Sequence, residues 1–550
     1  MFINWSLMLF LMSVFFLFMY MYMYYFNKIF ILEYYLNSIQ NMDFKFYFIF
    51  DWMSILFSIT VLMISSMVIL YSNSYMNLDK NKNSFCIIVL LFVSSMVILI
   101  LMPNMFMIIL GWDGLGLVSY CLVIYYQSVN SYNSGMMTII SNRIGDVMII
   151  LSLIFFVNFG SFDLLSFNNI ELICGILILI AALTKSAQLP FSAWLPAAMA
   201  APTPVSSLVH SSTLVTAGVY LLMRFNFLFK LNFFCLTLMK ISLITMLMAG
   251  ICAFLENDFK KIIAFSTLSQ LSMMMIIISL NLVELAFFHL IMHAFFKSLL
   301  FLCAGVIIHS FQGVQDIRML GNFFSVSPFI STCMFISLLS LMGFPFIGGF
   351  YSKDLILEFF FLKMNNMFML MIFIIGLIFT FLYCVRVSYM MFFKGIKYLT
   401  FINFKFDFFM KFSIFMLSIY VLILGNLMSW IILYNLNILF ISKESKILML
   451  MIMVLISFFF FMMKKNFYIK SKNFDFFFKI WNLSFLTSFI FLNLNYKFLF
   501  TSFSDWTWLE ILGVKPIFKY STNIYNLNYW IEKLNLNKIL LILMIMIMLI

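Results

Sequence analysis

The chain has 550 residues, of which 65% are hydrophobic and 9% charged, and its mean hydropathy is +1.11. Soluble domains are about one quarter charged, so this composition excludes an ordinary soluble protein. The net charge of +12 comes from short lysine clusters between apolar runs, such as Lys260 and Lys261. Such clusters are typical of loops that set membrane topology rather than of a nucleic-acid surface.

The apolar runs reach about 20 residues, the length that a helix needs to cross a bilayer. The alternation of a β-barrel is missing, so we predict an all-α polytopic membrane protein. About fifteen transmembrane helices are expected, with partial helices at two places. In chain order the apolar runs are 5–27, 48–72, 85–102, 104–127, 136–158, 172–190 (partial), 203–225, 235–255, 262–280, 284–308, 327–344, 350–363 (partial), 366–393, 410–436, 447–463, 476–493 and 538–550.

The eight cysteines are scattered without a CxxC or Cys/His cluster, which favours apolar filler over a disulfide framework, a zinc site or an iron–sulfur site. No charge precedes Lys28, so the first apolar run is predicted to be a retained span rather than a signal or transit peptide. The 75 phenylalanines and 47 methionines are typical of translation from an AT-rich genome, which suggests a mitochondrial gene. Residues 501–538 are too polar to cross a membrane, and either an interfacial helix or a solvated loop fits them.

The first ionisable residues within apolar sequence are Asp113, Arg143 and Asp146. Charges inside a bilayer are costly and mark functional sites by default. The glycines that surround Asp113 favour close helix packing over a phosphate loop, because no strand precedes them. Arg143 and Asp146 are spaced i,i+3 and can form an ion pair, with a structural role and a transport role both open.

Residues 181–224 differ in composition from the rest of the chain, because they are rich in Ala, Pro, Ser, Thr and Val. Four of the eight prolines lie here. Pro190 cannot donate to the carbonyl of Ser186, so a helix break beside Lys185 is predicted. Such a break is tolerated in lipid only where protein or a water-filled cavity covers it. A desolvated lysine holds its proton less tightly, and a nearby carboxylate reverses this, so Lys185 can load and release a proton. For His210, a hydrogen-bonded core residue and a relay member are equally plausible.

Farther along, His289, His293 and Lys297 follow at i, i+4 and i+8, which places them on one stripe of a helix. A metal site is disfavoured because no third ligand is evident, whereas groups of different basicity suit a proton path. A second break is predicted at Pro345, followed by Lys353 and Asp354. Two interrupted helices, each with a lysine beside the break, fit the internal structural repeats of secondary transporters, in which each repeat contributes a discontinuous helix.

Several motifs at these places resemble the antiporter-like membrane subunits of the proton-translocating NADH:ubiquinone oxidoreductase, respiratory complex I. The SKD motif and the long C-terminal extension favour the chain-5 branch of that family. The matching motifs cover about residues 50–390 and are GWDGLGLVSY, SNRIGD, LTKSAQLPFSAWLPAAMAAPTPVSSLVHSSTLVTAGVYL, HAFFKSLLFLCAG and GFPFIGGFYSKDLIL.

The resemblance implies two inverted five-helix repeats at 85–225 and 226–394, with the two broken helices as core elements. N-terminal transmembrane helices would occupy 1–84 and additional ones 395–500. Residues 501–550 would hold a lateral amphipathic helix and a terminal transmembrane anchor. The protein would lie in the mitochondrial inner membrane beside an adjacent antiporter-like subunit and membrane lipids. NADH, FMN, iron–sulfur clusters and ubiquinone would belong to partner subunits, with no cofactor or metal in this chain.

The resemblance also implies roles for individual residues. Asp113 stands where the family has a carboxylate, often Glu, that tunes Lys185. His210 would connect to the second half and Lys297 would be the central lysine, while Lys353 and Asp354 would form the exit-side pair. A free-standing cation/proton antiporter and a purely structural scaffold are the alternatives, and copurification with NADH-oxidising activity distinguishes the first of them.

Overall fold

The computed structural model describes residues 1–39, 42–157, 162, 172–364, 366–393, 407–432, 443–463, 480–504, 507, 514–532, 538 and 544–545. These residues divide into two compact units, Met1–Trp481 and Asn482–Ile550, which are described separately.

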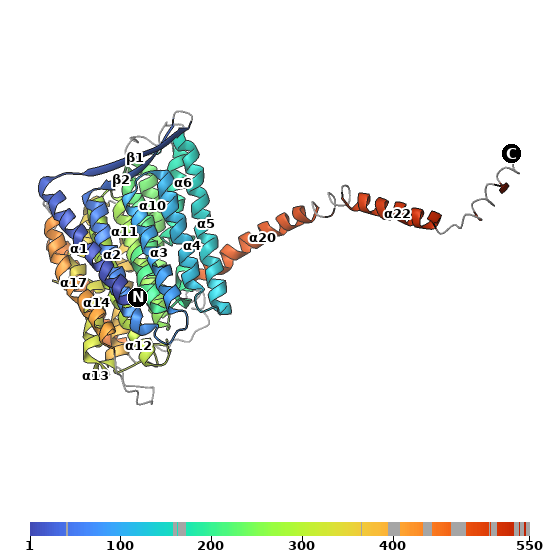
Figure 1. Cartoon of the computed structure of the whole chain (residues 1–550). Coiled ribbons are helices and arrows are strands. Elements are labelled where there is room, and N and C mark those ends of the chain that lie inside the picture. Colours follow the sequence, from blue (N-terminus) through green and yellow to red (C-terminus); the bar gives the residue numbers. More distant parts are fainter. Residues whose placement is uncertain are drawn as a thin grey trace. The chain divides into compact units, whose positions relative to one another are not determined.

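The first unit is a bundle of helices (Figure 1). Among the described residues, eleven helical segments are long and apolar enough to cross a membrane, which confirms the all-α polytopic fold. These segments are α1 (Phe2–Phe26), α2 (Trp52–Tyr75), α3 (Lys82–Leu101), α4 (Met105–Val123), α5 (Val129–Val157), Thr203–Arg224 (α8, η3 and α9), α10 (Asn232–Leu255), α11 (Phe259–Ser279), α12 (Val283–Ser310), Met367–Phe393 (α16 and η5) and α17 (Phe408–Ile432).

Further elements complete this unit, and three of them, α6, α14 and α15, begin or end at the predicted breaks. The bounds are α6 (Leu172–Lys185), α7 (Trp194–Ala197), η2 (Ala198–Ala200), η4 (Asn226–Lys230), α13 (Phe323–Val326), α14 (Pro328–Met342), α15 (Gly348–Lys363) and α18 (Lys443–Met463). Three segments, α11, α12 and Thr203–Arg224, are buried along their whole apolar window. They form the centre of the bundle, and α1 lies at its periphery with only 17% of its window buried.

A β-hairpin that the sequence pattern did not predict joins α1 to α2. Strand β1 (Phe30–Ile39) pairs antiparallel with β2 (Met42–Phe50), with Phe30 opposite Phe50 and an irregularity between Tyr35 and Asn37. The hairpin runs across one end of the bundle (Figure 1). The amide of Asn104, which caps α4, donates to the carbonyl of Lys45 at 3.2 Å and ties the hairpin to that end. The aromatic run in β2 hides the alternation by which a half-buried strand is recognised.

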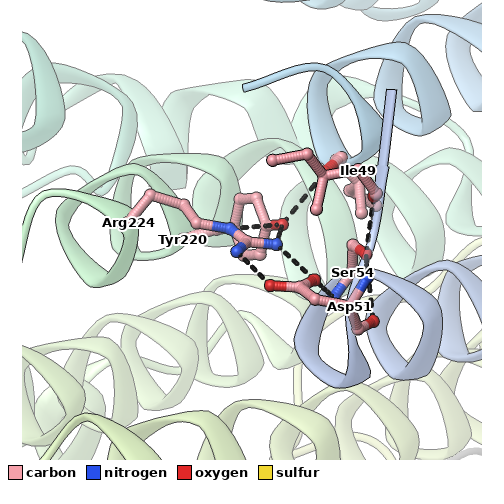
Figure 2. A network of polar contacts seen from close by, with 6 residues as sticks. Ile49, Asp51, Ser54, Tyr220 and Arg224 are labelled. Atoms are coloured by element: carbon pink, nitrogen blue, oxygen red, sulfur yellow. Dashed lines mark hydrogen bonds and ion pairs between the residues drawn. The ribbon is translucent and has the colours of Figure 1, made fainter. Parts of the chain in front are cut away.

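A partly buried ion pair joins the start of α2 to the end of α9 (Leu214–Arg224) (Figure 2). Arg224 binds Asp51 with two hydrogen bonds of 2.5 and 2.9 Å, and Asp51 also caps α2 through the backbone N–H of Ser54 at 2.8 Å. The hydroxyl of Tyr220 accepts from Arg224 and donates to the carbonyl of Ile100 at 3.0 Å. Bidentate geometry and extra hydrogen bonds are what a buried pair needs to offset desolvation. The network therefore fixes the end of the 181–224 stretch against α2 and α3.

The second unit contains α20 (Leu483–Ser504) and α22 (Val514–Glu532), and η8 (Ile480–Asn482) lies where the two units meet in the sequence. Helix α22 falls within the region predicted to hold the lateral helix and includes Trp530. Trp506, Trp508 and most of the expected terminal anchor lie outside the described residues. The lateral position of α22 stays a prediction.

Candidate functional site

Most of the predicted ionisable residues lie in the centre of the bundle, away from solvent and lipid. A desolvated charge in such a place needs compensating partners or a function that keeps it there. Those exposed by 1% or less are Lys185, His210, His289, His293, Lys297 and Lys353.

The first helix break lies at the end of α6, whose last residue is Lys185. The chain turns through Ala187, which has a φ of 54°, and Pro190 follows a cis peptide bond. The carbonyl of Ser186, expected to be a free acceptor, is approached by the side-chain amide of Gln188 at 3.4 Å. That side chain in turn accepts from the hydroxyl of Thr245 on α10 at 2.5 Å. Side chains thus stabilise the interrupted backbone, and the helix ends before the proline itself.

Lys185 reaches helix α4 through neutral groups. Its ammonium donates to the carbonyl of Trp112 at 3.2 Å and lies 5.0 Å from the centre of the indole ring. A Cβ at Gly116 would lie 3.4 Å from that ammonium, so the glycine leaves room for it. Gly111 and Gly114 instead pack α4 closely against α3, since a Cβ at these positions would meet Leu99 and Ser95 at 2.9 and 3.0 Å. Gly111 and Gly114 therefore serve close helix packing, as the sequence indicated, whereas Gly116 makes room for Lys185.

Two carboxylates near Lys185 are bound by an arginine. Arg143 lies 3.8 Å from Asp113 and 3.2 Å from Asp146, and the side chain of Asp146 is only 5% exposed. The expected direct pair between Asp113 and Lys185 is not formed within 4.0 Å, although the structure describes both residues. The physical reason is that the Trp112 carbonyl accepts from the lysine, while the carboxylate of Asp113 turns toward α5. The Arg143–Asp146 spacing places both on one face of α5, as expected.

His210 lies in an irregular helical segment. Within Thr203–Arg224, η3 (Ser206–Thr213) is π-helical, a form that occurs frequently at functional sites. Hydroxyls of Ser212 and Thr213 donate to the carbonyl of Leu208 at 2.9 and 2.7 Å and so satisfy backbone groups that the wider turn frees. Neither ring nitrogen of His210 has a hydrogen-bond partner within the described chain, and the ring centre lies 6.4 Å from that of Trp194.

The polar contacts of the stripe on α12 reach two other helices, α11 and α15. His289 lies 2.9 Å from the hydroxyl of Ser352 on α15 and 3.2 Å from the side-chain oxygen of Gln270 on α11. Lys297 donates to the hydroxyl of Ser266, also on α11. His293 lies between His289 and Lys297 on the stripe. Neither of its ring nitrogens has a hydrogen-bond partner among the residues described. No group of three potential metal ligands occurs in the described ranges.

The second break separates α14 from α15. Gly343 ends α14 in the left-handed region with a φ of 82°, and a Cβ at Gly349 would overlap the carbonyl oxygen of Ser340. Pro345 lies in the turn between the two helices. Lys353 then donates back to the carbonyls of Leu341 and Met342, both at 3.3 Å.

A side-chain hydroxyl completes the contacts of Lys353. Thr380 on α16 accepts from its ammonium at 3.1 Å. The expected pair of Lys353 with Asp354 is not formed within 4.0 Å, although the structure describes both residues. Consecutive helical residues point about 100° apart, which directs the two side chains to different sides. Asp354 is partly exposed, and the nearby Glu358 is 9% exposed.

Sequence reasoning missed several polar partners in these helices. Most of them are uncharged, so a search for charges in apolar sequence does not find them. The other two are charged but lie far apart in the sequence, so no local spacing pairs them. A polar residue that interrupts an apolar run, such as Gln270, is the signal that could have found them. The missed residues are Asp51, Arg224, Thr245, Ser266, Gln270, Ser352 and Thr380.

The fold and the buried site define a class of membrane protein. The family model "NADH:quinone oxidoreductase/Mrp antiporter, TM" matches residues 102–380, and that of the complex I chain 5 N-terminus matches residues 35–86. A chain in the structure of the Mrp complex from Dietzia sp. DQ12-45-1b has the same fold, with a TM-score of 0.74 and 21% identity over 94% of this chain and 60% of that one. The protein is thus an antiporter-like, multi-pass membrane subunit.

Curated relatives narrow this class further. The chain 5 of Anopheles arabiensis is 54% identical over 369 residues, which is 66% of this chain and 94% of the relative. The chain 5 of Aedes aegypti is 45% identical over 74% of this chain and 72% of the relative. The chain 5 of Locusta migratoria is 43% identical over 88% of this chain and 87% of the relative. The chain belongs to the NADH-ubiquinone oxidoreductase chain 5 family. It is a proton-translocating membrane subunit of complex I, as the motifs predicted, and works within a multi-subunit enzyme.

Proposed function

We propose that protons cross this subunit along the buried residues Lys185, His210, Lys297, His293, His289 and Lys353. The observation that carries the proposal is that these residues are at most 1% exposed and that, within the described part of the chain, the three lysines donate to neutral acceptors. A buried lysine without a paired carboxylate readily gives up its proton. Each lysine can therefore exist with or without its proton, which a relay requires.

In the first half, Arg143 and Lys185 would compete for the same carboxylates. With Asp113 and Asp146 paired with Arg143, as observed, the direct partners of the Lys185 ammonium among the described residues are the Trp112 carbonyl and the indole ring. A rotation of either carboxylate toward Lys185 would tighten its hold on the proton. Return of the carboxylate to Arg143 would release it. Redox energy from the rest of complex I would act by shifting this balance.

The middle of the path would run along α12. A rise of about 1.5 Å per residue spreads the three stripe residues over about 12 Å. His210 lies on η3, which packs against α12, and its unpartnered nitrogens could accept a proton from the first half. At the far end, His289 contacts Ser352, the residue before Lys353. A proton leaving Lys353 would then pass to the carboxylates Asp354 and Glu358, which lie nearer the surface of the bundle.

The remaining expectations belong to the assembly. We place the protein in the mitochondrial inner membrane, beside an adjacent antiporter-like subunit, with α22 as part of a lateral helix and the two repeats at 85–225 and 226–394. Support comes from the chain 5 relatives of insect origin and from the interrupted helices, one in each proposed repeat. NADH, FMN, iron–sulfur clusters and ubiquinone would be held by partner subunits.

The path is tested most simply at Lys297, in the centre of the stripe. In Lys297→Met, reconstituted complex I should translocate markedly fewer protons per NADH oxidised, because the link between the two halves is cut. Lys363→Met is a matched control, because this lysine also donates to one neutral oxygen, the carbonyl of Leu280, but lies at the end of α15. An unchanged proton-to-NADH ratio in a fully assembled Lys297→Met complex would rule out the relay.

A further inference from the structure

Both ring nitrogens of His289 are engaged, which distinguishes it from the other two histidines in the centre of the bundle. Its Nδ1 lies 2.9 Å from the hydroxyl of Ser352 on α15, and its Nε2 lies 3.2 Å from the side-chain oxygen of Gln270 on α11. The ring nitrogens of His210 and His293, in contrast, have no hydrogen-bond partner within the described ranges. The two partners of His289 therefore decide which of its nitrogens carries the proton.

The distances around His289 agree on one tautomer. A neutral imidazole has one N–H and one accepting nitrogen, and the oxygen of an amide can only accept. Nε2 must then donate to Gln270, and Nδ1 is the nitrogen that accepts from Ser352. The Ser352 hydroxyl has a single proton and a second acceptor, the carbonyl of Gly349, but that contact is longer at 3.3 Å. The shorter contact, to the imidazole, is the one that the hydroxyl proton makes.

Gln270 is fixed in place for this contact. The residue is 1% exposed and lies in α11, which is buried along its whole apolar window. The hydroxyl of Tyr383 on α16 lies next to its side chain and 3.4 Å from the hydroxyl of Ser269. Burial between α12 and α16 thus keeps the oxygen of Gln270 directed at Nε2 of His289.

We propose that Gln270 is a positioning residue of the proton path, which fixes the tautomer of His289 so that Nδ1, the nitrogen facing Ser352, exchanges the proton. The inference rests on the proposed function, because the tautomer matters only if His289 takes part in the relay. Ser352 directly precedes Lys353, so the accepting nitrogen faces the helix that carries this lysine.

The consequence is that His289 exchanges protons at one nitrogen only. An amide does not take up a proton at neutral pH, so Nε2 cannot hand its proton to Gln270. In the transfer, the Ser352 hydroxyl gives its proton to Nδ1 and receives one from the side of Lys353. The hydroxyl is left unchanged and the ring gains one positive charge, which the reverse transfer removes. His289 therefore stores a proton beside the second break and does not pass it across the ring.

The test compares two substitutions of Gln270 in assembled complex I in vesicles, with the rate of NADH-driven proton translocation as the readout. Gln270→Met keeps the length of the side chain and removes the acceptor, and should lower this rate by about fivefold, the equivalent of one neutral hydrogen bond. Gln270→Glu keeps an acceptor oxygen and should restore most of the rate. Thr267→Val is the matched control, because it removes a buried hydroxyl of α11 that donates to its own helix at 2.7 Å.

A second background shows whether Gln270 acts through the histidine. Adding Gln270→Met to His289→Phe should cause no further loss, since the nitrogen that Gln270 orients is then absent. If Gln270→Met does not assemble, Gln270→Asn takes its place, because it withdraws the same amide by one methylene group. If Gln270→Glu does not assemble, the His289→Phe background decides alone.

Three results would overturn the proposal, whereas a loss in Gln270→Met that Gln270→Glu restores supports it. One is equal pumping by Gln270→Met and Thr267→Val. Another is a Gln270→Glu variant as impaired as Gln270→Met, which would mean that the amide donates to Nε2 and that the opposite tautomer is present. A third is an additional loss in the His289→Phe background, which would give Gln270 a role apart from the histidine.

Lys297→Met, measured in the same vesicles, separates this inference from the relay itself. Reduced pumping in Lys297→Met together with normal pumping in Gln270→Met overturns the role of Gln270 and leaves the relay in place. Normal pumping in both variants overturns the relay and the role of Gln270 with it.

Discussion

The two helix breaks hold their lysines in different ways. Lys185, at the first break, contacts a carbonyl in the middle of α4 and has two carboxylates nearby that Arg143 binds. Lys353, at the second break, binds the last carbonyls of α14 and the hydroxyl of Thr380. The C-terminus of a helix carries a fixed partial negative charge, whereas a carboxylate is a full charge on a rotatable side chain.

This difference assigns different tasks to the two halves. Proton binding at Lys185 can change when a carboxylate turns, so the first half is suited to respond to events elsewhere in the complex. The surroundings of Lys353 are rigid dipoles, so its proton binding changes little. The first half would therefore set the direction of transfer and the second would pass the proton on.

Replacing Lys185 removes the group on which the carboxylates act, and should have the largest effect. We expect Lys185→Met to lower NADH-driven proton translocation by about tenfold or more, since the buried path has no substitute charge. Proton uptake into vesicles, normalised to assembled complex, measures this. If Lys185→Met pumped as well as the Lys363→Met control, the first half would have no active role.

Replacing Arg143 sharpens the comparison, because it frees both carboxylates in the first half only. In Arg143→Gln, Asp113 and Asp146 should turn to Lys185, which then keeps its proton and slows turnover by about fivefold, roughly one kcal/mol of added stabilisation. Arg318→Gln is the matched control, since Arg318 pairs with Asp316 at 2.5 Å in a loop outside the helices. Equal rates in the two variants would contradict the competition.

Replacing Thr380 tests the second half and should have the smallest effect. Thr380→Val removes one of three acceptors for Lys353 and leaves the helix-end carbonyls in place. Because two acceptors remain, the loss should be smaller than that of a full hydrogen bond to a charged group and should slow pumping by about threefold, or roughly 0.65 kcal/mol. Thr332→Val, which alters an exposed hydroxyl bonded to its own helix, serves as the control. A loss as large as that of Lys185→Met would mean that the second half, too, depends on a single partner.

Much of the fold and of the site could be predicted from the sequence, because a bilayer imposes strong rules. Long apolar runs show where helices lie, and any lysine or histidine inside them stands out. The stripe on α12 followed from spacing alone. Proline and glycine marked both breaks, and the helices end or begin within a few residues of them.

The rest depends on rotamers and on contacts between distant segments. Asp113 was expected beside Lys185, but whether a carboxylate turns to a lysine or an arginine depends on packing that no spacing reveals. Lys353 and Asp354 are neighbours in sequence, and the helix separates their side chains. The Asp51–Arg224 pair joins residues too far apart for a local pattern. The hairpin was missed because its strands lack clear alternation.

The central claim is that both lysines lie on one path, and a double-mutant cycle tests it most directly. The measurement is protons translocated per NADH for Lys185→Met, for Lys353→Met and for the double variant, in assembled complex I in vesicles. If both lysines lie on one path, the first substitution already blocks that path and the second adds no further loss. The double variant should then translocate as few protons per NADH as the more impaired of the two single variants. Losses that add in the double variant would show two independent paths and contradict the account.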